Sequence, residues 1–156
     1  MENCPRKSVK KSLGFTLIEL LVVIGILAIL LSIVLIAINP ARQFGQANNT
    51  KRRSAVTQIL NAVGAYAAEN KGNLPAAITI TDTEISTAGI DICSVLVPNY
   101  IPVLPTDPSL NIADVAPCPV SPATYATGYN IVKDTSNRVT VSAPSAENSE
   151  TITITR

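Results

Sequence analysis

The feature that most restricts what this chain can fold into is an almost uninterrupted apolar run near its N-terminus. From Phe15 to Ile38 there are 24 residues, and Glu19 is the only charged one among them. As an α-helix with a rise of 1.5 Å per residue, this run is about 36 Å long, enough to cross a hydrocarbon layer of about 30 Å. The sequence therefore predicts a membrane-spanning helix, with the remainder of the 156 residues forming one small domain.

Basic residues before the run predict its orientation. Arg6, Lys7, Lys10 and Lys11 precede it, and such residues stay on the cytoplasmic side, so the C-terminal part lies outside. A secretory signal peptide is the alternative, but its apolar region is normally about 7 to 15 residues long. The residues after the run, Asn39–Arg42, also make a weak cleavage site. We expect a single-pass protein of the cytoplasmic (inner) membrane, N-terminus in and C-terminus out.

The composition excludes most catalytic and metal-binding chemistry. The chain has no histidine, which removes Ser-His and Cys-His nucleophile pairs and His-ligated zinc. Of 12 basic and 11 acidic residues, four basic and one acidic lie in residues 1–14, so the rest carries a side-chain charge of −2. A mildly acidic domain is a poor nucleic-acid binder. We expect no enzyme activity, cofactor, metal or specific nucleic-acid partner.

The order of features around the apolar run resembles a known family. A basic leader is followed by GFTLIELLVVIGILAILLSIVLIAINP, beginning at Gly14. This string is similar to the N-terminus of type IV prepilins and of the pseudopilins of type II secretion and competence systems. In that family a membrane-embedded peptidase cuts after the glycine and methylates the new terminal amine. The resemblance implies cleavage between Gly14 and Phe15 and N-methylation of Phe15.

The charge of Glu19 within the apolar run needs a physical explanation that is independent of the resemblance. A carboxylate near the end of a membrane helix costs a few kcal/mol unless it has a partner. The resemblance implies that Glu19 meets the terminal ammonium of Phe15 in a neighbouring subunit. At ~4 Å and an effective dielectric constant of ~20, that pair gains about 4 kcal/mol of Coulomb energy before desolvation is subtracted. Alternatively, Glu19 lies among lipid headgroups, stabilised by the helix dipole.

A helical pattern continues past the apolar run, with a break expected at Pro40. Proline lacks the amide hydrogen that a helix interior needs, so it kinks or locally melts the helix. The alternative, compatible with this one, is that Pro40 marks the exit from the membrane. Apolar residues then recur at intervals of three and four up to Lys71, and Gly72 ends the helix. We expect one long, bent helix over residues 15–71. Its predicted apolar face is Val56, Ile59, Leu60, Val63 and Tyr66, and its polar face Gln43, Gln46, Asn49, Arg53 and Gln58.

The C-terminal part has the pattern of short strands. Residues 127–156 alternate apolar and polar side chains in three runs separated by polar turns, which predicts a three-stranded antiparallel meander. Residues 77–81 alternate in the same way. Three strands cannot bury a core alone, so the sheet should pack on the helix, giving an α+β, pilin-like fold. The expected parts are a leader (1–14), a transmembrane or filament-core helix (15–38), an amphipathic helix (39–71) and a globular head (72–156).

Two cysteines lie in the part expected outside the cytoplasm. Cys4 falls in the leader, whereas Cys93 and Cys118 lie 25 residues apart in the head. In an oxidising compartment two cysteines predict one disulfide. Free thiols are the alternative.

Charged clusters in the head are expected to be solvated. Lys51-Arg52-Arg53 has no interleaved aromatic residues for base stacking, so it should face solvent or a neighbouring subunit, with a lipid surface as the alternative. Some major pseudopilins bind Ca²⁺ in a loop of the head. The head of this chain lacks the D-x-D-x-D-G pattern of a Ca²⁺-binding loop. These acids, expected to be solvated, are Asp107, Asp114, Asp134, Glu147 and Glu150.

Together these features predict a structural subunit of a type IV pilus-like filament. The resemblance implies as partners a prepilin peptidase, further copies of the chain, other pilins, the membrane, and an assembly platform with its ATPase. It implies a surface or extracellular location after assembly. A pseudopilin of a secretion or DNA-uptake system is the alternative within this class. A membrane-anchored binding protein that never polymerises and an anchored enzyme are the alternatives outside it.

Overall fold

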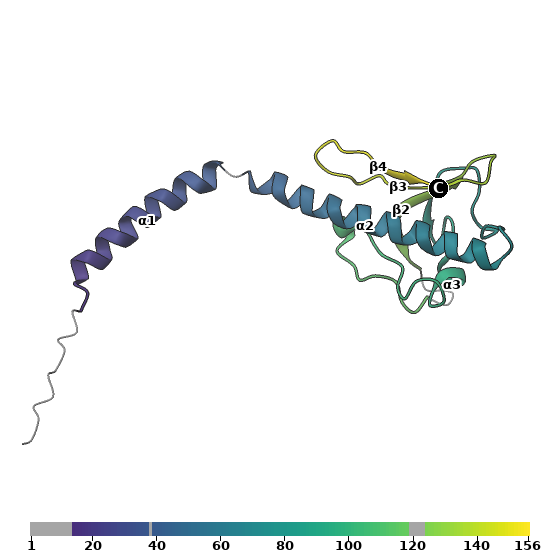
Figure 1. The fold of residues 1–156 in the computed structure, drawn as a ribbon, viewed down its shortest axis with the longest axis horizontal. Coiled ribbons are helices and arrows are strands. Elements are labelled where there is room, and N and C mark those ends of the chain that lie inside the picture. The colour runs from purple at the N-terminus through teal and green to yellow at the C-terminus, as the bar shows by residue number, and fades with distance from the viewer. Residues whose placement is uncertain (1–13, 38, 119–123) are drawn as a thin grey trace, which may run out of the picture. The chain divides into compact units, whose positions relative to one another are not determined.

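The computed structural model describes residues 14–37, 39–118 and 124–156 of the chain. They divide into an N-terminal unit that ends at Pro40 and a second unit from Ala41 to Arg156. The elements, in chain order, are α1 (Leu17–Ala37), α2 (Pro40–Glu69), β1 (Thr83–Ser86), α3 (Cys93–Leu96), the 3-10 turn η1 (Pro108–Leu110), β2 (Ala126–Lys133), β3 (Val139–Ala143) and β4 (Ile152–Thr155) (Figure 1).

Helix α1 is apolar around its whole circumference. Every residue from 14 to 36 is exposed in this unit. The span Leu17–Ile36 is long and apolar enough to cross a membrane. A helix without a polar face is stable only where lipid or other helices surround it. Within the described part of this unit, no other element covers the segment.

Two helices replace the single bent helix predicted over residues 15–71. Helix α1 ends at Ala37, Asn39 is not helical, and α2 begins at Pro40. The first position of a helix suits proline, because its missing amide hydrogen has no intrahelical partner there. At the other end, the Gly72 N–H donates to the Ala67 carbonyl at 2.8 Å, and Lys71 and Gly72 both have positive φ. This Schellman-type cap ends α2 close to the predicted residue.

The sheet has four antiparallel strands, in the order β1-β2-β3-β4, one more than predicted. The three C-terminal strands are confirmed. The strand expected at residues 77–81 is wrong, because the Ile78 N–H donates to the Pro75 carbonyl in a turn. The additional strand β1 lies a few residues later, where Thr83 pairs with Ile131 of β2. Pairing with β2 therefore makes a strand of Thr83–Ser86, although its side chains do not alternate.

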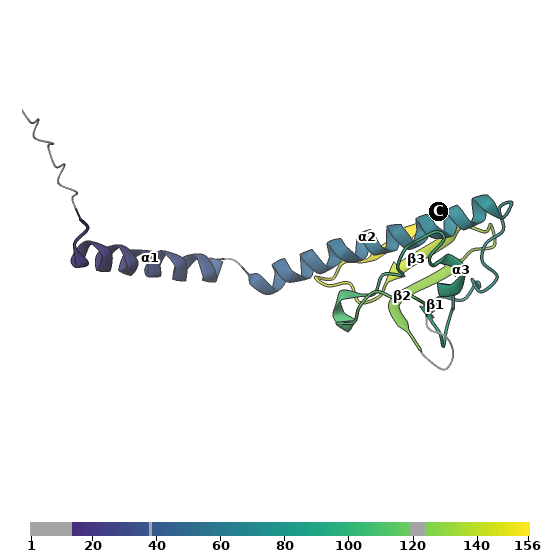
Figure 2. The same cartoon turned by 90° about the horizontal axis from the view of Figure 1, so that it is seen from below.

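Helix α2 runs along one face of this sheet (Figure 2). Its predicted apolar face is confirmed, with Tyr66 only partly buried. The face meets the inner row of the sheet, which includes the fully buried Ile131 and Val141, paired across β2 and β3. Leu96 and Leu104, from the segment before β2, complete the same core. The result is an α+β head built around the second part of α2.

Candidate functional site

The start of α1 is organised by reciprocal hydrogen bonds between Thr16 and Glu19. The Thr16 N–H and hydroxyl donate to Glu19 Oε2 at 2.9 and 2.8 Å, and the Glu19 N–H donates to Thr16 Oγ1 at 3.2 Å. This is a capping box, which satisfies amide groups that the first turn of a helix leaves without partners. Sequence reasoning considered Glu19 alone and missed Thr16, although the spacing T-x-x-E before an apolar run is a sign of this motif.

The capping box uses only one oxygen of the Glu19 carboxylate. Among the described residues, Glu19 Oε1 has no hydrogen-bond partner. Phe15, Ile18, Val22 and Val23 line a shallow groove beside this carboxylate, and the Phe15 side chain is 89% exposed. The Glu19 carboxylate therefore lies at the edge of an exposed apolar surface.

Gly14 has no structural requirement for glycine. A Cβ at this position would meet no atom within 4 Å, and its φ lies outside the positive range that favours glycine. Gly14 and Phe15 are both exposed and precede the helix. A requirement for glycine at this position would therefore come from a molecule that binds residues 14 and 15, and not from the fold.

In the head, the prediction that the basic cluster is solvated is wrong for Arg52. Its side chain is fully buried, and its Nε and Nη2 donate to the two carboxylate oxygens of Asp107 at 2.7 and 3.0 Å. Its Nη1 donates to Asn49 Oδ1 and to Glu147 Oε1, both at 3.0 Å. Asp107, predicted to be solvated, is 1% exposed, and Asn49, predicted on the polar face, is fully buried. Arg52 therefore joins α2 to two loops.

The ionisation of Asp107 contributes to the stability of the head. Burial raises its pKa, but hydrogen bonds from Arg52, and from the N–H and hydroxyl of Ser109 at 2.9 and 2.6 Å, outweigh burial and lower the pKa below its usual value. A carboxyl with a lowered pKa in the folded state stabilises that state above its unfolded pKa. This contribution is lost as the pH falls through the lowered pKa.

Two other acids of the five bind elsewhere in the head. Asp114 accepts from the Thr106 N–H, and Asp134 pairs with Arg138. The described ranges contain no group of three or more His, Cys, Asp or Glu residues arranged to hold a metal. A Ca²⁺ site formed by all five acids is therefore not assembled in the described part of the head.

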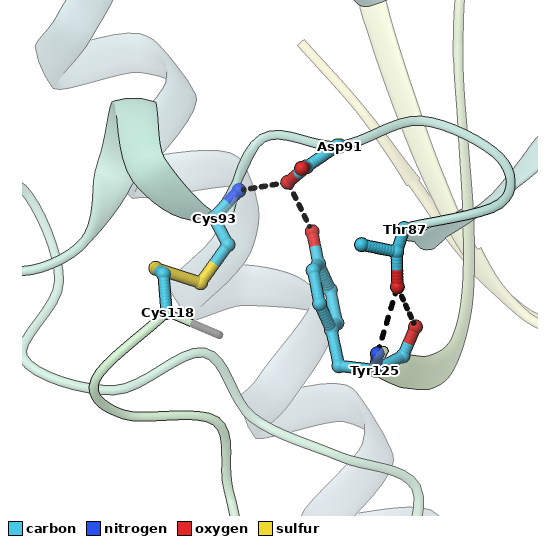
Figure 3. The surroundings of a disulfide bond; sticks show 5 residues. All are labelled: Thr87, Asp91, Cys93, Cys118 and Tyr125. Atoms are coloured by element: carbon cyan, nitrogen blue, oxygen red, sulfur yellow. Dashed lines mark hydrogen bonds between the residues drawn. A yellow bond between two sulfur atoms is a disulfide. The ribbon is translucent and has the colours of Figure 1, made fainter. Parts of the chain in front are cut away.

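The disulfide predicted between Cys93 and Cys118 is present, with Cα atoms 5.6 Å apart (Figure 3). Asp91 lies beside it, and its Oδ1 accepts from the Cys93 N–H at 3.1 Å and from the Tyr125 hydroxyl at 2.7 Å. Burial and the neighbouring Asp91 carboxylate raise the pKa of Tyr125. Thr87 also binds the backbone of Tyr125 through its hydroxyl. The disulfide and these polar contacts fasten the start of α3 to the chain before β2.

Replacing both Cys93 and Cys118 with serine is expected to lower the free energy of unfolding of the head by about 3.5 kcal/mol, from the entropy of closing a loop of this length. Urea denaturation of the full-length, oxidised protein in detergent measures this change in the free energy of unfolding. Cys4→Ser is the control and should leave the unfolding midpoint unchanged. A loss below about 1 kcal/mol in the double variant would contradict the expected contribution.

Comparison with known proteins identifies the N-terminal segment. Residues 9–35 match the family described as the prokaryotic N-terminal methylation motif, which is the type IV prepilin and pseudopilin signal. Neither the curated proteins nor the solved structures gave a significant match. The matched range contains the Gly14–Phe15 junction and the capping box. The motif implies processing by a prepilin peptidase and pilin-type assembly, and together with α1 it fits a single-pass, membrane-anchored protein.

Proposed function

We propose that this chain is a structural, non-catalytic subunit of a type IV pilus-like filament, cut between Gly14 and Phe15 and assembled through α1. The observation that supports this most is the methylation motif over residues 9–35, which overlaps a helix with no cover of its own. Lipid surrounds such a helix while the subunit is stored in the membrane. In a filament, the helices of neighbouring subunits replace the lipid, because close packing compensates for the lost lipid contacts.

Glu19 aligns an incoming subunit in this proposal. Cleavage creates a terminal ammonium on Phe15, and Glu19 Oε1 is the oxygen that the capping box leaves for the ammonium of a neighbour. Identical subunits joined by such a heterologous contact form an open helix. The work of extraction comes from an assembly platform and its ATPase, as in the proteins that this N-terminus resembles.

The first test is intact mass and N-terminal sequencing of the protein from its native host. The expected mature chain starts at Phe15 and carries one added methyl group. Gly14→Leu, chosen because a Cβ at residue 14 would meet no atom within 4 Å, is expected to accumulate with its leader attached. A wild-type protein that still starts at Met1, or that starts after residue 38, would rule out this processing.

The second test separates the filament from its alternatives. Shearing of cells should release the processed protein in high-molecular-weight fibres. The motif is shared with pseudopilins, so the second candidate is a pseudopilin of a secretion or DNA-uptake system; its fibres would stay in the envelope fraction after shearing. Processed protein found only as detergent-extractable monomer would contradict both forms of assembly and favour an anchored binding protein.

A further inference from the structure

Helix α2 is attached to the head in two different ways along its length. From Ala55 onward its buried side chains are apolar and belong to the core. Before that point its buried residues are Gly45, Asn49 and Arg52, none of which supplies an apolar side chain. The first part of α2, residues 40–53, is therefore not held on the head by the hydrophobic core.

The loop between β3 and β4, residues 144–151, holds this first part. Asn49 Nδ2 donates to the Glu147 carbonyl at 2.7 Å, and its Oδ1 accepts from the Glu147 N–H at 2.9 Å. Glu147 Oε1 accepts from Asn48 at 2.9 Å and from Arg52 at 3.0 Å. These contacts are all polar, so they depend on charge and solvent in a way that the core does not.

Further along the loop, the same pattern continues. Arg53 Nη2 donates to Glu150 Oε2 at 2.6 Å, and Glu150 also accepts from Asn49. Asn148 Nδ2 donates to the Arg42 carbonyl at 3.2 Å, beside Gly45, where a Cβ would lie 2.7 Å from that nitrogen. The absence of a side chain at Gly45 thus lets the loop lie close to the helix.

We infer that the β3–β4 loop is a charge-dependent latch that holds residues 40–53 of α2 on the head and releases them when its carboxylates lose their ion pairs. Release of the loop removes the partners of Asn48, Asn49 and Arg53, so the helix frays with it, while the buried Arg52–Asp107 pair stays in place. Residues 40–53 follow α1 in the chain, so a pull on α1 reaches the polar latch before it reaches the core. This behaviour belongs to the head itself and does not depend on assembly into a filament.

The charged groups around the latch determine its response to salt and pH. Glu147 faces Arg52 from α2 and, beyond it, Asp107 from the segment before η1, whereas Glu150 faces Arg53. Hydrogen bonds from Asn48 and Arg52 lower the pKa of Glu147. A lowered pKa means that the latch is fully held at neutral pH and weakens as the pH falls through it.

Hydrogen exchange measured by mass spectrometry on the full-length protein in detergent, at fixed pH and salt, tests the latch. In the double variant Glu147→Gln/Glu150→Gln, exchange is expected to rise about tenfold together in peptides covering residues 40–53 and 144–151. Peptides from α2 beyond Ala55 and from β2 should keep wild-type exchange. In a separate series at increasing salt concentration, hydrogen exchange of the wild-type protein should also rise in these two segments.

Glu69→Gln is the control for loss of a carboxylate, because it removes one negative charge near the other end of α2, where Glu69 accepts from Tyr100. It should leave exchange in both latch segments unchanged. The inference is overturned if the double variant changes neither segment, or if only the loop exchanges faster while residues 40–53 keep their protection. These outcomes concern the head alone, so they stay distinct from a failure of processing or of fibre formation.

Discussion

Replacing Arg52 with methionine is expected to lower the free energy of unfolding of the head by about 3 to 5 kcal/mol. The guanidinium and the Asp107 carboxylate are both fully buried, so the variant leaves Asp107 as an unpaired charge in the interior. Methionine keeps most of the length and apolar surface of the arginine stem, which limits the effect of lost packing. Urea denaturation of the full-length protein in detergent, followed by tyrosine fluorescence because the chain has no tryptophan, measures the loss.

Two further variants separate the buried pair from a general effect of removing a positive charge. Arg138→Met breaks an exposed pair, with side chains 66% and 35% exposed, and should cost no more than about 1 kcal/mol. The double variant Arg52→Met/Asp107→Leu removes both buried charges and should regain most of the stability. If Arg52→Met costs no more than Arg138→Met, the buried pair does not have the role assigned to it.

Replacing Glu19 with glutamine is expected to reduce sheared fibres at least tenfold while leaving cleavage and methylation intact. Glutamine also serves at the third position of a capping box, so α1 should still begin at Leu17. In the proposed assembly, the variant removes the charge that would attract the terminal ammonium of a neighbouring subunit. Comparison of fibre yield with N-terminal mass in the same cells measures both effects.

Thr16→Val is the complement of this variant. It removes the hydroxyl of the capping box and keeps the Glu19 charge, so it should weaken the start of α1 by about 1 kcal/mol and preserve fibres. Wild-type fibre yield in Glu19→Gln would show that the charge is not needed for assembly. Loss of fibres in Thr16→Val alone would assign the role of Glu19 to capping.

The sequence was sufficient for elements whose determinants are local. The apolar run predicted α1, and intervals of three and four predicted the core face of α2 through Val56, Ile59 and Val63. Alternation predicted β2, β3 and β4. It did not place β1, because the side chains of Thr83–Ser86 do not alternate, and the pairing of this segment with β2 depends on distant residues.

The candidate site shows the same division. The methylation motif and Glu19 were visible in the sequence, and the capping partner Thr16 was missed although its spacing is local. The burial of Arg52 was not predictable, since its partner Asp107 lies 55 residues away and nothing within Lys51-Arg52-Arg53 distinguishes the middle residue. A charged cluster says little about burial until the loops that cover it are placed.

Because the strands that bury the apolar face of α2 come later in the chain, this face is synthesised before them. The strands that bury it, β2 to β4, lie 57 to 86 residues after Glu69. At about 5 to 20 residues per second this delay is roughly 3 to 17 s. The segment containing Tyr100 is made earlier, and Tyr100 contacts Tyr66 and Glu69 of the helix. Among the segments that contact α2, the one containing Tyr100 is therefore available well before the sheet.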